Sequence, residues 1–81
     1  MTAHVFVSPK RTVLDPQGQA IQSALAGMGH RTITDVRQGK YFEIAIEGAT
    51  SAEAARKEIE TIAAEVLTNP VIEDYRIEML D

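Results

Sequence analysis

The side chains that could do acid–base or metal chemistry are few in this sequence, and they stand apart from one another. It has two histidines, His4 and His30, and no cysteine, which excludes thiolate metal sites. Neither histidine lies in a spacing that is typical of metal ligands. His4 falls on a predicted strand and His30 follows a predicted helix. We therefore expect both histidines to be surface or interface residues, not catalytic bases.

The carboxylates that lie closest in the sequence also fail as an acid–base pair. Glu73 and Asp74 are adjacent on a predicted strand, so their side chains point to opposite faces. Glu43 and Glu47 share a face, but the rise of a strand separates them by about 13 Å. We expect a solvated or salt-bridged surface at both places.

A third group of charged residues, Asp35, Arg37 and Lys40, flanks a predicted turn at Gly39. Asp35 and Arg37 share a strand face, and Lys40 lies across the turn. Exposed loops on a rigid scaffold often carry binding residues. The pattern alone leaves two interpretations open, a merely soluble turn and a contact loop.

The elements that must position these residues alternate between strand and helix. In order they are a strand over 2–8, a helix from 16 to a stop at 29, strands over 32–37 and 41–47, a helix that is opened by the residues 50–53 and ends at 69–70, and a strand over 71–80. Asp15 is a helix cap and Pro16 suits the first helical position. Thr50 and Glu53 have the spacing of a capping box at the start of the second helix.

This order predicts an α+β fold, a two-layer sandwich formed by the single domain 1–81. The antiparallel sheet carries both helices on one face, as in the split βαβ or ferredoxin-like arrangement. Phe6, Ile72 and Leu80 are expected on the face without helices. An uncovered face that carries apolar residues is a candidate docking surface.

Size and charge limit the classes of function. A chain of 81 residues rarely gains more than about 3–5 kcal/mol from a single core. Without disulfides or a metal, association with another copy becomes the expected source of stability. The net charge of −4 argues against nucleic-acid binding. No apolar run is long enough for a membrane span, and no signal peptide is recognised, so a cytoplasmic location is expected.

Three segments together resemble one known family. They are Val13-Leu14-Asp15-Pro16-Gln17-Gly18, Asp35-Val36-Arg37-Gln38-Gly39-Lys40-Tyr41 and Asn69-Pro70-Val71-Ile72-Glu73-Asp74-Tyr75. In this order and spacing, and over essentially the whole chain, they resemble the PurS family. PurS is the small subunit of the bacterial and archaeal phosphoribosylformylglycinamidine synthase.

The resemblance implies a non-catalytic assembly subunit in de novo purine biosynthesis. Such a subunit bridges a glutaminase subunit, which releases ammonia, and a large synthetase subunit, which uses ATP and Mg²⁺. It assists the transfer of ammonia between them and forms a dimer or tetramer with itself. The resemblance implies no cofactor and no catalytic residue on this chain.

The motif positions divide into structural residues and expected contacts. Asp15, Pro16 and Gly39 have the helix-start and turn roles given above. The expected partner-binding residues are the remainder, Arg37, Lys40, Tyr41, Glu73, Asp74 and Tyr75. The segment 8–10 is a further candidate for a subunit interface.

Two other functions stay open on the residues alone. Domains with this strand and helix order include dimeric modules that sense small molecules, although the 9–14 loop has no glycine with which to approach a ligand. An RNA-binding domain needs exposed aromatic residues on the sheet, and its expected charge is basic.

Overall fold

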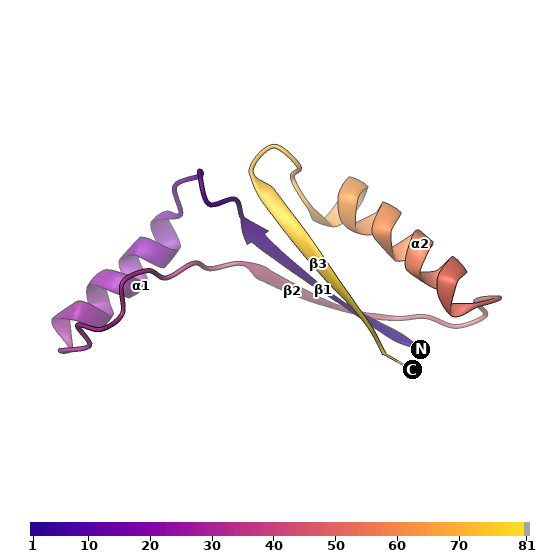
Figure 1. Ribbon diagram of the computed structural model, residues 1–81, viewed down its shortest axis with the longest axis horizontal. Coiled ribbons are helices and arrows are strands. Elements are labelled where there is room, and N and C mark those ends of the chain that lie inside the picture. Colours follow the sequence, from indigo (N-terminus) through magenta and orange to yellow (C-terminus); the bar gives the residue numbers. More distant parts are fainter. Residues whose placement is uncertain (81) are drawn as a thin grey trace.

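A computed structural model describes residues 1–80 and shows an antiparallel sheet with two helices (Figure 1). In chain order the elements are β1 (Thr2–Pro9), α1 (Pro16–Gly27), β2 (Lys40–Ala45), α2 (Ala52–Ile62), the π-helical turn η1 (Ala63–Leu67) and β3 (Glu73–Leu80). The predicted α+β class with an antiparallel sheet is confirmed. Within the described residues the sheet has three strands, in the order β2-β1-β3.

The central strand β1 alternates between the two faces of the sheet. Ala3, Val5 and Val7 are buried on the face that α2 covers. Val5 lies opposite Phe42 of β2 and Ile77 of β3, which pack against the same core. The alternation of buried apolar residues and partly exposed residues along β1 therefore fixes the register of both neighbours.

The helix α2 closes the core with one narrow stripe. Ala55 and Ile59 of α2 and Ala63 of η1 recur every four residues and are buried, and the last two pack in the core cluster with Ala3, Val5 and Val7 of β1. The helix begins one residue later than the predicted capping box requires. Ser51 is the N-cap, and its hydroxyl accepts a hydrogen bond from Ala54 N at 3.0 Å. The predicted role of Thr50 as the cap is therefore wrong.

The helix α1 does not lie on the sheet. It projects from the end of β1, and the chain then runs back beside it to reach β2 (Figure 1). We call α1 and this returning segment, residues 16–39, the arm. The predicted cap is confirmed, since Asp15 accepts a hydrogen bond from Gly18 N. Gly29, with φ of 96°, lies just beyond the end of the helix, as expected.

Two predictions about the arm are wrong. Residues 32–37 form no strand, so they make no hairpin with β2, and α1 does not share a sheet face with α2. The extended backbone of the returning segment bonds instead to side chains near α1. Gln22 Nε2 donates to Thr34 O at 2.8 Å, and Gln38 N donates to Asp15 Oδ2 at 2.7 Å. These bonds occupy main-chain groups that a sheet ladder needs.

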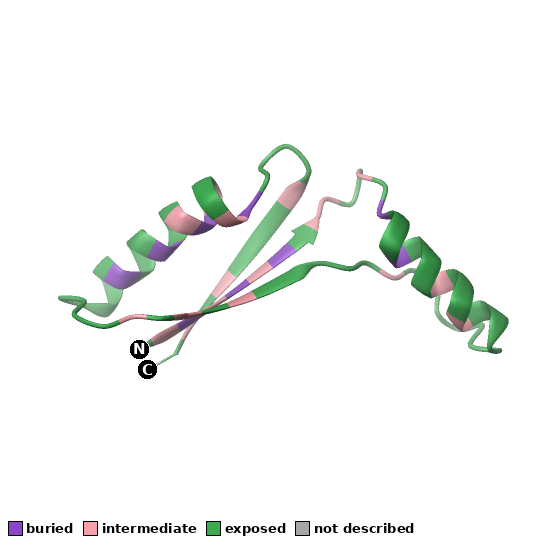
Figure 2. Cartoon of the chain, turned by 180° about the vertical axis from the view of Figure 1, so that it is seen from behind, coloured by how far each residue is buried: buried purple, intermediate pink, exposed green. Residues whose placement is uncertain are grey.

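The arm makes the subunit unusually extended. Its Cα radius of gyration is 16.1 Å, whereas a compact domain of this length is expected to have about 12 Å. Figure 2 shows most of α1 exposed, with buried positions concentrated in β1 and along one side of α2. No helix within residues 1–80 combines the length and the apolar character that a membrane crossing needs.

Replacing Gly18 with Ala tests how closely the arm is packed. A Cβ atom there collides with the carbonyl oxygen of Val36 and lies 2.6 Å from Asp15 Oδ2. We expect Gly18→Ala to lower the free energy of unfolding by about 1–3 kcal/mol. Gly27→Ala is the matched control in the same helix, because nothing lies within 4 Å of its Cβ position.

Urea denaturation at a fixed protein concentration measures both variants. Gly27→Ala should be neutral or stabilising by up to about 1 kcal/mol. Equal effects of the two substitutions would contradict the close packing of α1 on the returning segment.

Candidate functional site

One end of the sheet gathers most of the predicted partner-binding residues. There β1 ends while β2 and β3 begin, so Val7 lies opposite both Lys40 and Tyr75. Asp74 and Glu73 follow in register beside Ser8 and Pro9 of β1. The antiparallel pairing thus brings together residues that are more than thirty positions apart in the sequence.

Glu73 is the most buried of the paired charges on β2 and β3 at this end. Its side chain is 15% exposed, and its Oε1 accepts a hydrogen bond from Asn69 N at 2.8 Å. Its Oε2 lies 3.6 Å from Lys40 Nζ. Glu73 therefore closes the turn before β3 and also joins β3 to the start of β2.

Asp74 has a looser pairing. Its side chain is 71% exposed, and its Oδ1 lies 3.9 Å from Lys10 Nζ. Exposed pairs at such distances contribute little to stability. Lys10 was expected at the interface as part of the 8–10 segment, and that contact stays a prediction.

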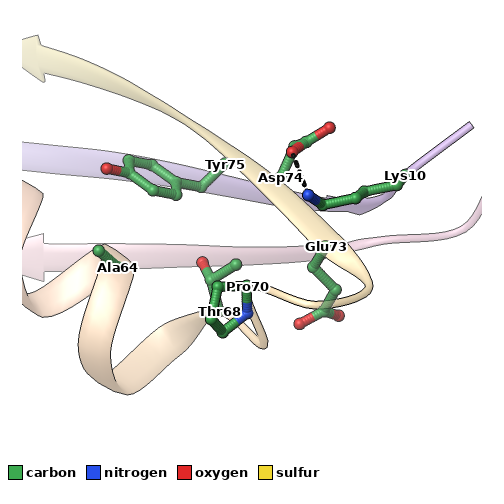
Figure 3. Close-up of a pocket in the computed structure, with 7 residues that line it drawn as sticks. All are labelled: Lys10, Ala64, Thr68, Pro70, Glu73, Asp74 and Tyr75. Atoms are coloured by element: carbon green, nitrogen blue, oxygen red, sulfur yellow. Dashed lines mark ion pairs between the residues drawn. The ribbon is translucent and has the colours of Figure 1, made fainter.

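A hollow of about 420 Å³ opens beside these residues, and we call it the Thr68 hollow (Figure 3). Its lining comes from β3, the start of η1, the loop that follows η1 and the loop after β1. The lining residues are Lys10, Ala64, Thr68, Pro70, Glu73, Asp74 and Tyr75. Sequence reasoning did not single out Ala64 or Thr68. The one available signal was a polar residue directly after the apolar stripe of the second helix.

Arg37 lies beside this end and binds the loop after β1. Its guanidinium donates to Val13 O at 2.7 Å and to Arg11 O at 2.9 Å, with a longer bond to Lys10 O. Asp35 Oδ2 lies 3.7 Å from its Nε. Arg37 thus has an intramolecular role that its sequence position did not reveal. Its contact with a partner stays a prediction.

Asp15 joins the arm to the sheet. Its carboxylate accepts hydrogen bonds from Gln38 N at 2.7 Å and from Gly18 N at 3.1 Å. These bonds, with the nearby charge of Arg37, hold the pKa of Asp15 below its usual value, although partial burial opposes the shift. The negative charge of Asp15 is therefore a structural requirement of this junction.

Tyr41 belongs to the opposite, uncovered face of the sheet. Its ring centroid lies 5.1 Å from that of Phe6 and 5.3 Å from that of His4. Arg76 lies over the Phe6 ring at 4.3 Å. Desolvation, together with the negative charge of Glu43 and Glu78, raises the pKa of Tyr41 above its usual value. The predicted place of Phe6 on this face is confirmed.

The described residues are better suited to contact than to catalysis. Within residues 1–80, no three His, Cys, Asp or Glu side chains are grouped so that they could hold a metal ion. His4 packs edge-on against aromatic rings, and His30 is exposed after α1. The sheet end offers ion pairs and an open hollow, and the uncovered face offers an aromatic cluster.

Comparisons with known proteins agree on one family. The family model "PurS: Phosphoribosylformylglycinamidine (FGAM) synthase" matches residues 2–81. The phosphoribosylformylglycinamidine synthase subunit PurS of Mycobacterium leprae is 47% identical over 75 residues, which cover 93% of this chain and 90% of the relative.

Solved structures agree in fold as well as in sequence. PurS of Bacillus subtilis is 41% identical, with a TM-score of 0.85 and coverage of 99% of this chain and 98% of that one. The structure of PurLQS from Thermotoga maritima contains a chain that matches at 28% identity with a TM-score of 0.85. That match covers 98% of this chain and 96% of the other.

Acid titration tests the junction at Asp15. Because its pKa in the folded state lies below the unfolded value of about 3.9, its carboxylate stabilises the fold above that pH. This contribution is lost as the pH falls toward the folded-state pKa. Asp15→Asn leaves one acceptor oxygen for two N–H donors, so we expect a less stable chain at pH 7.

The stability difference between the unaltered chain and Asp15→Asn should shrink below about pH 4. The urea midpoints of the two proteins, measured from pH 7 to pH 3, give this stability difference. Asp35→Asn is the control for the loss of one exposed carboxylate on the arm. A difference that stays constant over this range would contradict the charged junction.

Proposed function

Because this chain belongs to the PurS family, we propose that it is the small assembly subunit of phosphoribosylformylglycinamidine synthase, without catalytic activity of its own. The complex is an ATP- and glutamine-dependent C–N ligase of purine biosynthesis. The observation that carries this proposal is the family match over residues 2–81, together with near-complete coverage of PurS relatives. The comparisons give no support to the small-molecule-sensing alternative.

The subunit bridges the glutaminase and synthetase subunits. The PurLQS match supports this role, because its name joins PurS to further subunits. The charged sheet end supplies exposed residues for such contacts, with Lys40 and Asp74 more than half exposed. ATP and Mg²⁺ act on the synthetase subunit, and the bridge assists the passage of ammonia from the glutaminase. The expected location is the cytoplasm.

The subunit also associates with itself, as a dimer or tetramer. Several apolar residues on and before α1 are exposed, among them Leu14 at 67%, Ile21 at 39% and Met28 at 73%. The charges support a contact between residues 8–40 of one copy and residues 41–80 of another. Residues 8–40 carry five basic and two acidic side chains, whereas residues 41–80 carry three basic and nine acidic ones.

Activity of the reconstituted complex tests the assembly role. We expect glutamine to support amidine formation by the synthetase and glutaminase subunits only when this chain is added. Free ammonia should support turnover by the synthetase without it. Steady-state rates with each nitrogen donor, with and without the chain, measure the coupling. Rates that are indifferent to the chain with both donors would overturn the proposal.

A charge on the exposed side of α1 tests self-association. Ile21→Asp places a carboxylate among the exposed apolar residues, so we expect dissociation at micromolar concentration. Ser23→Asp adds the same charge at an exposed position on the opposite side of the helix and should leave the oligomer intact. Sedimentation velocity measures both variants. An unchanged sedimentation coefficient for Ile21→Asp would exclude α1 from the contact.

A further inference from the structure

The hydroxyl of Thr68 has no partner in this subunit. The residue is only 8% exposed, and within residues 1–80 its Oγ1 is the one buried side-chain polar atom that lacks a hydrogen bond. Such a group costs free energy, because folding removes it from water without replacing the lost bond. A threonine retained under this cost points to a bond that forms only when something else is bound.

The surroundings of Thr68 also point to a binding site. It directly follows η1, and π-helical turns occur frequently at functional sites. In Figure 3 its oxygen points up from the loop toward the strands, between Ala64 and Glu73. The oxygen is shielded from solvent, and one staggered step about χ1 moves it to the position that the methyl group holds here. Thr68 can therefore present its hydroxyl to the hollow that it lines.

The Thr68 hollow combines apolar walls with one weakly paired carboxylate, that of Asp74. Ala64, Pro70 and the ring of Tyr75 supply the apolar surface. Glu73 is already bonded to Asn69 N and paired with Lys40. The carboxylate of Asp74, in contrast, has only the ammonium of Lys10 nearby, at a distance that is too long for a hydrogen bond.

We propose that the Thr68 hollow receives an arginine side chain from another subunit of the synthase. The methylene groups of the arginine pack against the apolar walls, and its guanidinium stacks on the face of the Tyr75 ring. The guanidinium donates to the Asp74 carboxylate and to the Thr68 hydroxyl. This inference rests on the proposed function, because it specifies how a partner is held.

Charge and shape favour this occupant over the alternatives. Residues 41–80, which supply most of the lining, carry a large acidic excess. The hollow is open to solvent, which suits a side chain that enters from a neighbouring surface. In the free subunit the Lys10 ammonium lies beside Asp74, where the incoming guanidinium binds in the complex. Because this pairing is weak, the Lys10 side chain can move away when the arginine enters.

Replacing Thr68 with Val separates this role from a structural one. Valine keeps the shape and removes the unpaired hydroxyl, so we expect the melting temperature of the free subunit to rise by about 4 °C. Affinity for the partner subunits should fall by about three- to tenfold. Thr61→Val, on the exposed side of α2, is the matched control. A structural role alone moves both quantities in the same direction or leaves the affinity unchanged.

The charges at the rim identify the occupant. We expect Asp74→Asn to weaken binding to the purified glutaminase and synthetase subunits by about tenfold or more, whereas Lys10→Gln should strengthen it. Glu47→Gln, at the opposite end of the sheet, is the charge control. Calorimetry and analytical ultracentrifugation give the affinities and the state of self-association.

The reverse pattern, with Lys10→Gln weakening the complex, would show an anionic occupant and overturn the proposal. A loss of self-association in Asp74→Asn would assign the hollow to a second copy of this chain and also overturn it. Unchanged affinity in all variants would overturn the inference while leaving the assembly role in place. No complex with the unaltered chain would overturn both.

Discussion

The buried row of Ala3, Val5 and Val7 in β1 is the constraint on which the rest of the chain depends. Both other strands pair only with β1, and α2 buries its stripe against the same three side chains. Successive side chains of a strand point to opposite faces, so the residues between these three positions point away from the core. His4 and Phe6 are thereby placed on the open face, where Tyr41 and Arg76 join them.

The segments that carry the family resemblance meet in space at the end of β1. Asp15 of the first segment accepts a hydrogen bond from Gln38 of the second. Lys40 of the second segment pairs with Glu73 of the third. The motif therefore encodes one junction that holds the arm, the sheet and the turn before β3 together. The surface beside this junction is where we place the contacts with partner subunits.

Local sequence signals predicted the parts of the fold that depend on near neighbours. The cap at Asp15 and the orientation of Phe42 and Ile44 toward the core were both accessible from residue type and spacing. The path of residues 32–37 was not accessible in this way, because a β-like pattern does not reveal whether another strand is available to pair with this segment. Bonds from Gln22 and Asp15 side chains decided that path instead.

The same limit applies to the site. The sequence indicates only an exposed charge at Arg37, because its three hydrogen-bond acceptors are main-chain carbonyl oxygens 24 to 27 residues away. Thr68 read as the end of a helix because its lack of a partner is visible only in three dimensions.

The bonds of Arg37 have a consequence for how this family can diverge. They reach the carbonyl oxygens of Lys10, Arg11 and Val13, so these bonds do not depend on which side chains stand at the three positions. Every amino acid offers the same carbonyl group, so substitutions in this loop need not disturb the junction. The side chains of this loop can therefore change together with the surface of a partner subunit, while the backbone bonds of the junction stay the same.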